Sequence, residues 1–451
     1  MSKKNIEKWS LGYWFLKGYA IFLLNIFYKR IHVQNYENVP KKEPVIFALN
    51  HQNALMDALA IHCTTNKQLV FLARADIFKN PLIARFLTFI KILPIYRIRD
   101  GANTLNKNIE IFKKSLEILK NKKAMGIMPE GSHGDKRQLR PLKKGIFKIA
   151  FKAEEENNNQ LGVKILPVGL DYSNYQNLGS YLHVTYGKPI IVSDYYKLYK
   201  KNEKLGMDAL KKALVENLKV LMINIQNSRF YDLYQSLREI YNFRMRQLLS
   251  IKNNNYPDKF KADKKMIEIL DKYHKNHSSE MEILDIKVSE YNQGINLLNL
   301  KNWLLEKPES PVSTLFLQSF LLSLCLPLYF YGVLNNYFPY KIPIWLVKKI
   351  KDKQFHSSFK FVMAMILFPV FYLFQTVLVF SMTKNPWIKY LYIVSIPISG
   401  IIAFNYYDTF KKISAKWRYF RLLRNQNERI ISLRKIRNEI IQTMDSIVNS
   451  I

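Results

Sequence analysis

Two long apolar segments near the C-terminus constrain the fold of this chain more than any other feature. After Lys360, residues 361–380 carry no acidic or basic side chain, and residues 386–404 carry only Lys389 near their start. An α-helix needs about 20 such residues to cross the hydrocarbon of a bilayer. We therefore predict two transmembrane helices, over residues 359–380 and 386–404, joined as a hairpin.

A third apolar segment, residues 312–338, precedes this hairpin and is interrupted by Pro327, Gly332 and Asn335-Asn336. It is predicted either to span the membrane as a broken helix or to re-enter on the same side. The loop after it carries Lys341, Lys348, Lys349, Lys351 and Lys353. Because basic loops stay in the cytoplasm, we favour re-entry, with the N-terminal domain and the C-terminal tail both cytoplasmic.

The whole chain is strongly basic, with a formal net charge of +34 although 48% of its residues are hydrophobic. Such a charge favours an anionic partner, either a membrane surface or a nucleic acid. Residues 406–451 place ten Lys and Arg side chains among apolar residues at helical spacing. No nucleic-acid-binding motif accompanies the charge, so we predict a basic amphipathic C-terminal helix on anionic lipid headgroups and no nucleic acid partner.

The first 31 residues resemble a signal peptide, because Lys3-Lys4 precede an apolar stretch from Leu11 to Phe27. Lys17 interrupts that stretch and no small-residue cleavage site follows it, so we expect the segment to be retained. Aromatic and aliphatic residues recur there at helical spacing, which predicts a helix in the membrane interface over residues 1–31. The alternative is an amphipathic helix that covers a domain core.

Residues 32–193 alternate short β-rich apolar runs with helical stretches, which predicts an α/β domain with a central, mostly buried sheet flanked by helices. The expected strands are 45–49, 69–72, 94–96, 125–128, 165–170 and 182–186, and the expected helices are 57–62, 81–90, 105–121 and 145–155. Residues 194–310, rich in Lys, Asn, Glu and Leu, are predicted to form a helical insert or linker, followed by the membrane region 311–405. Cys63 and Cys325 lie too far apart in sequence to suggest a disulfide framework or a cysteine-based zinc site.

The stretch Asn50 to Leu59 (NHQNALMDAL) places His51 and Asp57 six positions apart, directly after the expected strand 45–49. A histidine can take up a proton near neutral pH, and a nearby carboxylate can orient it and stabilise the imidazolium. Such pairs also cap helices or satisfy buried polar groups. Since the motif holds no Ser or Cys nucleophile, direct transfer to an acceptor hydroxyl is favoured over an acyl-enzyme.

Three further motifs each follow or end an expected strand: residues 93–99 (LPIYRIR), 126–135 (GIMPEGSHGD) and 166–170 (LPVGL). In this order and spacing, the four motifs resemble the sequence blocks of the glycerolipid acyltransferase family. That family has four residues between the histidine and the aspartate and an arginine after the Glu-Gly-Thr, whereas this chain has five residues and His133. The longer spacing is more similar to the branch that includes the fungal glycerol-3-phosphate acyltransferases.

The resemblance implies a role for each matching residue. His51 would be the general base, oriented by Asp57, and Arg97 or Arg99 would bind the acceptor phosphate. Glu130, Gly131 and Ser132 would form the floor of the phosphate pocket, with Glu130 acting through a cationic partner. His133 stands at the position of the missing arginine, and Pro167 would shape the acyl-donor pocket from the end of a strand.

The implied reaction transfers an acyl chain from an acyl-CoA or acyl-carrier-protein thioester to lysophosphatidate, giving phosphatidate. The alternative acceptor is glycerol 3-phosphate. Neither a metal nor a cofactor is expected, and the expected partners are membrane lipids, the acyl donor and the glycerol-phosphate acceptor. Two other classes remain open: a metal-dependent phosphohydrolase using His51, Asp57, His133 and Asp135, and a non-catalytic basic membrane adaptor.

Overall fold

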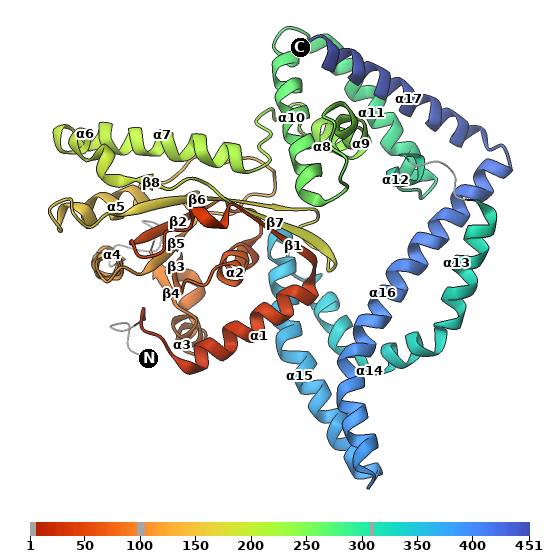
Figure 1. Cartoon of the computed structure of the whole chain (residues 1–451), viewed down its shortest axis with the longest axis horizontal. Coiled ribbons are helices and arrows are strands. Elements are labelled where there is room, and N and C mark those ends of the chain that lie inside the picture. The colour runs from red at the N-terminus through yellow and green to blue at the C-terminus, as the bar shows by residue number, and fades with distance from the viewer. Residues whose placement is uncertain (1–5, 97–103, 307–310) are drawn as a thin grey trace. The chain divides into compact units, whose positions relative to one another are not determined.

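The structure is a computed structural model that describes residues 6–96, 104–306 and 311–451 (Figure 1). It contains two compact units. The first comprises residues 1–224 together with Ile350–Ser358, and the second comprises Ile225–Lys349 and Phe359–Ile451.

The first unit is built on one eight-stranded sheet with the strand order β1-β7-β6-β2-β5-β3-β4, in which β8 also pairs with β6. The pairs that β6 makes with β7 and β8 are antiparallel and all others are parallel. The strands are β1 Tyr28–Gln34, β2 Val45–Leu49, β3 Leu69–Arg74, β4 Ile92–Ile95, β5 Ala124–Ile127, β6 Lys164–Tyr172, β7 Ser180–Tyr186 and β8 Ile190–Ile191.

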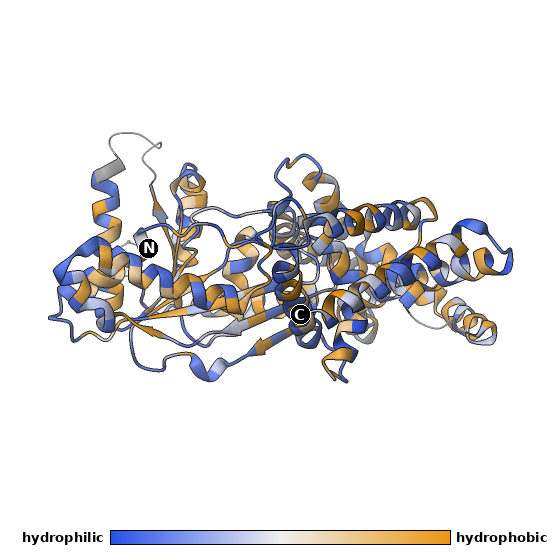
Figure 2. Ribbon diagram, turned by 90° about the horizontal axis from the view of Figure 1, so that it is seen from above, coloured by the Kyte–Doolittle hydropathy of each residue, from blue (hydrophilic) through white to orange (hydrophobic). Residues whose placement is uncertain are grey.

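The centre of the sheet is the buried strand β2, whose five residues Val-Ile-Phe-Ala-Leu are all inaccessible to solvent. It lies between β5 and β6, parallel to both, and helices cover the sheet, which explains the uninterrupted apolar run. Figure 2 shows hydrophobic strands and helices with one hydrophobic and one hydrophilic side. The predicted α/β class with a mostly buried sheet is confirmed.

The α-helices that lie wholly within the described residues of this unit are α1 Leu11–Phe27, α2 Ala54–Thr64, α3 Pro81–Phe89, α4 Thr104–Lys120, α5 Gly145–Glu155, α6 Tyr196–Lys201 and α7 Glu203–Leu221. Helix α7 packs against β6 so closely that a Cβ atom added to Gly169 would lie 2.0 Å from the carbonyl oxygen of Leu221. The unit therefore extends to Asn224, beyond the predicted boundary at residue 193.

The N-terminal helix α1 ends at Phe27, and the predicted helical segment 1–31 was too long. Tyr28 instead begins the edge strand β1, which pairs with β7. One side of α1 is buried through Tyr13, Ala20 and Leu24, whereas its exposed side carries apolar residues, Trp14, Phe15 and Phe22 among them. Helix α1 thus covers the core and also presents an apolar surface, so its place in the membrane interface stays a prediction.

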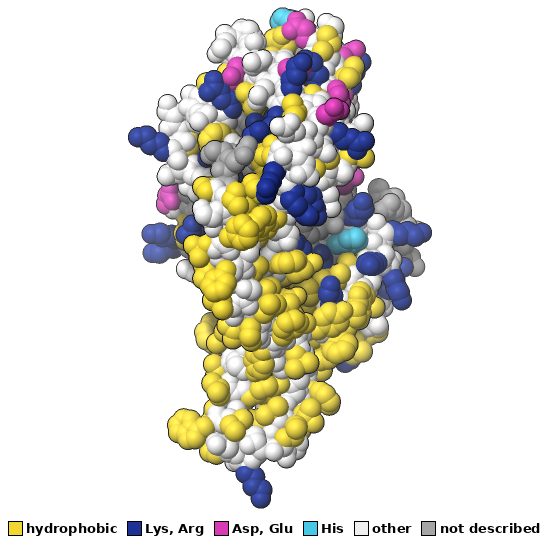
Figure 3. All heavy atoms as spheres, turned by 90° about the vertical axis from the view of Figure 1, so that its right-hand side faces the viewer, with side chains coloured by type: hydrophobic (Ala, Val, Ile, Leu, Met, Phe, Trp, Pro, Cys, Tyr) yellow, Lys and Arg dark blue, Asp and Glu magenta, His cyan; other side chains and the backbone are white. Residues whose placement is uncertain are grey.

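The second unit is helical. Its helices are α8 Tyr231–Ile240, α9 Asn242–Leu248, α10 Tyr256–His274, α11 Ser278–Leu297, α12 Asn302–Glu306, α13 Val312–Leu324, α14 Leu326–Val347, α15 His356–Met382, α16 Pro386–Arg424 and α17 Glu428–Asn449, of which α15 begins in the first unit. Helices α15 and α16 are long and apolar enough to cross a membrane. Figure 3 shows hydrophobic side chains gathered on the surface of this part of the chain.

The other apolar segment is broken, as its sequence predicted. Helices α13 and α14 meet at a bend of 52°, a geometry that fits either a broken span or a re-entrant segment. Helix α14 continues to Val347, past the predicted end at residue 338, although Pro339 and Pro343 lie inside it.

The C-terminal tail differs from the prediction of one basic lipid-facing helix over residues 406–451. Helix α16 runs unbroken from the apolar segment into the basic one and ends only at Arg424. The apolar side of α17 packs on α11 and α10 and buries Ile440 and Met444. Arg437 is buried as well and donates to the carbonyl of Ile240, so it faces the protein and not a headgroup.

Candidate active site

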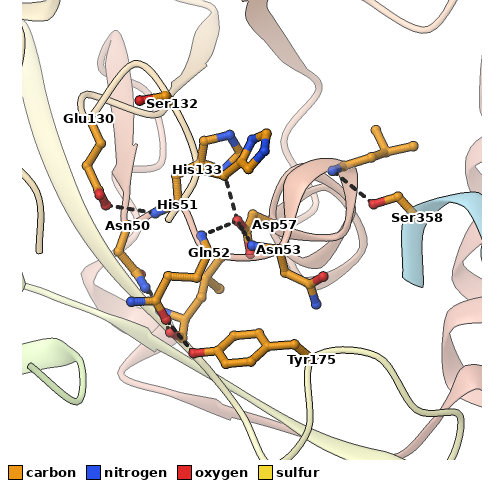
Figure 4. A network of polar contacts seen from close by, with 12 residues as sticks. Asn50, His51, Gln52, Asn53, Asp57, Glu130, Ser132, His133, Tyr175 and Ser358 are labelled. Atoms are coloured by element: carbon orange, nitrogen blue, oxygen red, sulfur yellow. Dashed lines mark hydrogen bonds and ion pairs between the residues drawn. The ribbon is translucent and has the colours of Figure 1, made fainter. Parts of the chain in front are cut away.

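His51 and Asp57 meet at the carboxyl end of β2 (Figure 4). The His51 Nδ1 and Asp57 Oδ2 atoms are 2.9 Å apart, with Asp57 fully buried and 15% of the His51 side chain exposed. Six positions of a regular helix add about 240° of rotation beyond one full turn, which would leave the two side chains about 120° apart. The chain avoids this because α2 begins only at Ala54, whose φ of 44° is left-handed, and His51 lies in the loop before it.

The carboxylate of Asp57 accepts hydrogen bonds from four donors. Its Oδ2 atom accepts the backbone N–H groups of Gln52 and Asn53, both at 2.8 Å, in addition to His51 Nδ1. Its Oδ1 atom accepts the hydroxyl of Tyr172, also at 2.8 Å, from the end of β6. An ionised carboxylate only accepts, so the hydrogen of neutral His51 lies on Nδ1 and the lone pair of Nε2 is available to take a proton.

Glu130 ties the loop after β5 to the loop after β2. The parallel register of β2 and β5 pairs Ala48 with Ile127, so the loops that follow the two strands begin at the same level of the sheet. The buried carboxylate of Glu130 accepts the backbone N–H of His51 at 2.9 Å and that of Arg140 at 3.3 Å. Burial raises the pKa of Glu130 to about 7, against the opposing effect of these two N–H groups.

The expected cationic partner of Glu130 is therefore replaced by backbone N–H groups. The guanidinium of Arg140 instead donates to the carbonyls of Ser132 and His133, which fixes the turn after Glu130. Gly131 has a φ of 72° in that turn, and a Cβ atom there would lie 3.1 Å from Cγ of Lys143. Both the backbone conformation and the close approach favour glycine.

His133 lies beside His51. Their ring centroids are 5.5 Å apart and the rings are nearly perpendicular. His133 Nε2 also lies 2.9 Å from Asp352 Oδ2, and its ring packs edge-on against Phe355 at 4.7 Å. Asp352 and Phe355 were not predicted, because they follow His133 by more than two hundred residues and no motif marks them.

The remaining predicted residues are only partly brought to this site. Pro167 lies inside β6, opposite Ala48, and the strand continues to Tyr172. It is therefore a buried residue of the sheet and does not lie at a strand end, contrary to the prediction. Arg97 and Arg99 lie outside the described residues.

The metal-binding alternative has no geometric support in the described ranges. Within residues 6–96, 104–306 and 311–451, no three His, Cys, Asp or Glu side chains converge as a metal site would require. Asp57, one of the four suggested ligands, already accepts four hydrogen bonds.

The fold and the site define an α/β protein with a histidine–aspartate pair at the carboxyl end of its central strand. Residues 30–171 match the model of the family described as Acyltransferase. Residues 30–171 therefore form an acyltransferase domain, as the sequence motifs predicted.

Individual relatives extend this finding. The chloroplastic 1-acyl-sn-glycerol-3-phosphate acyltransferase LPAT1 of Arabidopsis thaliana is 26% identical over 34% of this chain and 39% of its own length. Glycerol-3-phosphate O-acyltransferase 1 of Saccharomyces cerevisiae is 22% identical over 63% of this chain and 39% of its own length. The chain thus spans about two fifths of either relative.

The crystal structure of the 1-acyl-sn-glycerophosphate acyltransferase PlsC from Thermotoga maritima aligns with a TM-score of 0.34 at 18% identity. That alignment covers 46% of this chain and 79% of PlsC.

Proposed function

We propose that this protein transfers a fatty acyl chain from a thioester donor, acyl-CoA or acyl-carrier protein, to the hydroxyl of lysophosphatidate and so makes phosphatidate. The observation that carries the proposal is the hydrogen bond between His51 Nδ1 and Asp57 Oδ2. It directs the free Nε2 atom of a partly exposed imidazole away from the carboxylate, where it can meet a substrate hydroxyl.

In the proposed reaction, His51 Nε2 removes the hydroxyl proton while the acceptor oxygen bonds to the thioester carbonyl carbon. Asp57 stabilises the imidazolium that forms, and its own four donors keep it oriented. The tetrahedral intermediate then collapses, the carbon–sulfur bond breaks and the imidazolium returns the proton to the thiolate. No enzyme-bound acyl group or resident cofactor enters this sequence of steps.

The second candidate acceptor is glycerol 3-phosphate. The yeast relative, which is named for that acceptor, aligns over 63% of the chain, whereas the plant relative named for the monoacyl acceptor aligns over 34%. Lysophosphatidate is preferred because its acyl chain partitions into the bilayer, where the apolar helices α15 and α16 would hold the enzyme. We therefore propose an integral membrane enzyme with its catalytic domain in the cytoplasm.

The test is acyl transfer by the full-length protein reconstituted in vesicles, with a labelled acyl-CoA and lysophosphatidate or glycerol 3-phosphate offered separately. His51→Ala and Asp57→Ala should each lower the rate about 100-fold or more, since general-base assistance contributes that much. His277→Ala is the matched control, because its ring stacks on Tyr273 in the second unit.

Wild-type protein that acylates neither acceptor would refute the proposal. Near-normal rates in His51→Ala would instead refute the role of His51 as the general base. A clear preference for glycerol 3-phosphate would replace the proposed acceptor by the second candidate.

A further inference from the structure

A short segment from far along the chain lies on the catalytic loop. Residues 350–358, here called the strap, belong to the first unit although they follow His51 by about three hundred residues. The strap contains a short 3-10 helix over Lys353–Phe355 and the first turn of α15. It makes two groups of contacts, one with the start of α2 and one with His133.

The first group of contacts caps helix α2. Asn53 occupies the N-cap position, yet its side chain caps no backbone N–H of this helix. The Ser357 hydroxyl instead donates to Asn53 Oδ1 at 2.6 Å, and Ser358 Oγ accepts the backbone N–H of Leu55 at 3.1 Å. Both serines are buried, so the N-terminus of α2, which would otherwise leave backbone donors unsatisfied, is completed by the strap.

The residues held in this way are those that orient Asp57. The backbone N–H of Asn53 donates to Asp57 Oδ2, and the next residue, Ala54, has a left-handed φ of 44°. A non-glycine residue in that conformation is strained and persists only where its surroundings hold it. Ser357 and Ser358 bond to the residues on either side of Ala54 and thereby hold this turn.

The second group of contacts reaches the other histidine. Asp352 pairs with His133 Nε2, and the Phe355 ring packs edge-on against the same imidazole. His133 in turn packs edge-on against His51. The strap therefore contacts both loops that form the site, the loop after β2 and the loop after β5.

We propose that the strap is a positioning element of the active site, in which Ser357 and Ser358 set the geometry of the His51–Asp57 pair. The inference rests on the acyl transfer proposed above. Because the strap ends in the first turn of α15, the same helix that is long and apolar enough to span a membrane also completes the catalytic loop. Ser357 and Ser358 act through Asn53, Leu55 and Asp57, so they should affect the rate of the chemical step and leave substrate binding unchanged.

The experiment compares Ser357→Ala, Ser358→Ala and the double variant in the full-length reconstituted protein. The control is Ser381→Ala, which lies in the same helix but donates only to the carbonyl of Leu378 in its own turn. We expect the double variant to lower kcat about 10- to 100-fold, as small displacements of catalytic groups do, with both KM values changed by less than about twofold. Ser358→Thr retains the accepting oxygen and should restore most of the rate lost in Ser358→Ala.

The outcomes separate the two proposals. If the double variant has the same kcat as Ser381→Ala, the strap inference is wrong. Acyl transfer by the wild-type protein in the same experiment would still support the proposed function. Failure of Ser358→Thr to restore the rate, with an unfolding temperature equal to wild type, would also overturn it. Wild-type protein inactive with both acceptors would instead overturn the proposed function. If Ser357→Ala fails to fold, Ser358→Ala and Ser358→Thr decide the question.

Discussion

Asp57 is held by two stretches of the chain that are more than a hundred residues apart. The loop before α2 supplies three of its donors, and Tyr172 at the end of β6 supplies the fourth. A hydrogen bond to a charged group contributes about 1.5–3 kcal/mol, and a buried acceptor that loses its donor is costly. Tyr172 should therefore act as a positioning residue for the carboxylate.

Tyr172→Phe removes only the hydroxyl and should lower kcat about tenfold, because Asp57 Oδ1 loses its donor and its hold on His51 loosens. Tyr186→Phe is the matched control, since this buried tyrosine of the neighbouring strand β7 bonds Thr64 and not Asp57. Steady-state acyl transfer by the two variants provides the comparison. Equal rates would show that the Tyr172 hydroxyl has no part in positioning Asp57.

The residues of the site were unequally visible in the sequence. His51, Asp57 and Glu130 each follow a strand of apolar residues, so parallel pairing brings them to one edge of the sheet. Tyr172 was missed because the predicted strand ended at residue 170, and extending it by two residues would have placed a hydroxyl at the site. Asp352 carries no such signal, because its contact with His133 depends on the return of a distant segment.

At the level of elements, α1 is joined to α2 by the contact of Tyr13 with His62. The Tyr13 hydroxyl and His62 Nε2 are 2.7 Å apart. Burial, together with the nearby charge of Lys17, lowers the pKa of His62 to about 3. Neutral His62 is therefore the form that fits the folded state.

The sign of the pH effect follows from that lowered pKa. The stability that neutral His62 contributes is fully present above the unfolded pKa of about 6.5. Below that pH the free energy of unfolding decreases by about 1.4 kcal/mol per pH unit. Between pH 7 and pH 5, hydrogen exchange corrected for its intrinsic rate should become faster in α1. His62→Gln cannot be protonated, so its α1 amides should show a weaker pH dependence, and an identical dependence in both proteins would contradict this assignment.

The elements were predictable where their apolar periodicity is local. Six of the strands follow short apolar runs, and α5 begins and ends at the predicted residues. Strand β1 was missed because Lys29 and Arg30 interrupt its apolar pattern, as befits an exposed edge strand. The end of α16 was missed because residues 405–424 retain helical spacing while their polarity changes.

At the level of the whole molecule, the strap constrains how the chain can cross a membrane. Residues 350–358 belong to the unit that contains the sheet, so in the proposed membrane-bound enzyme they would lie on the same side of the bilayer as that unit. The bent pair α13 and α14 would then return to the side from which it started, and α15 would be the next helix to cross. This agrees with the re-entrant arrangement favoured by the lysine distribution.

Cysteine labelling from one side of sealed vesicles tests this topology in a protein whose Cys63 and Cys325 are replaced by Ala. Lys351→Cys in the strap and Lys188→Cys after β7 should be labelled from the same side, and Lys384→Cys between α15 and α16 from the other. Labelling of positions 351 and 188 from opposite sides would contradict re-entry of α13 and α14.

The membrane region was predictable in composition but not in packing. The length and apolarity of residues 359–380 and 386–404 are enough to predict two helices that could cross a membrane. The helical spacing of the basic residues predicted that Arg437 contacts lipid headgroups. That prediction was wrong because Arg437 packs against Ile240, which belongs to a helix from a different part of the chain.

The distance along the chain between the strap and α2 also sets an order of events during synthesis. The sheet is complete once β8 has emerged, yet the hydrogen bonds to Asn53 and Leu55 join residues 304 and 303 positions apart. At about 5–20 residues per second, the stretch from Asn224 to Ser358 takes roughly 7–27 s to synthesise. Until Ser358 has been made, the catalytic loop lacks the hydrogen bonds from Ser357 and Ser358, so we expect the nascent domain to be less active than the complete protein.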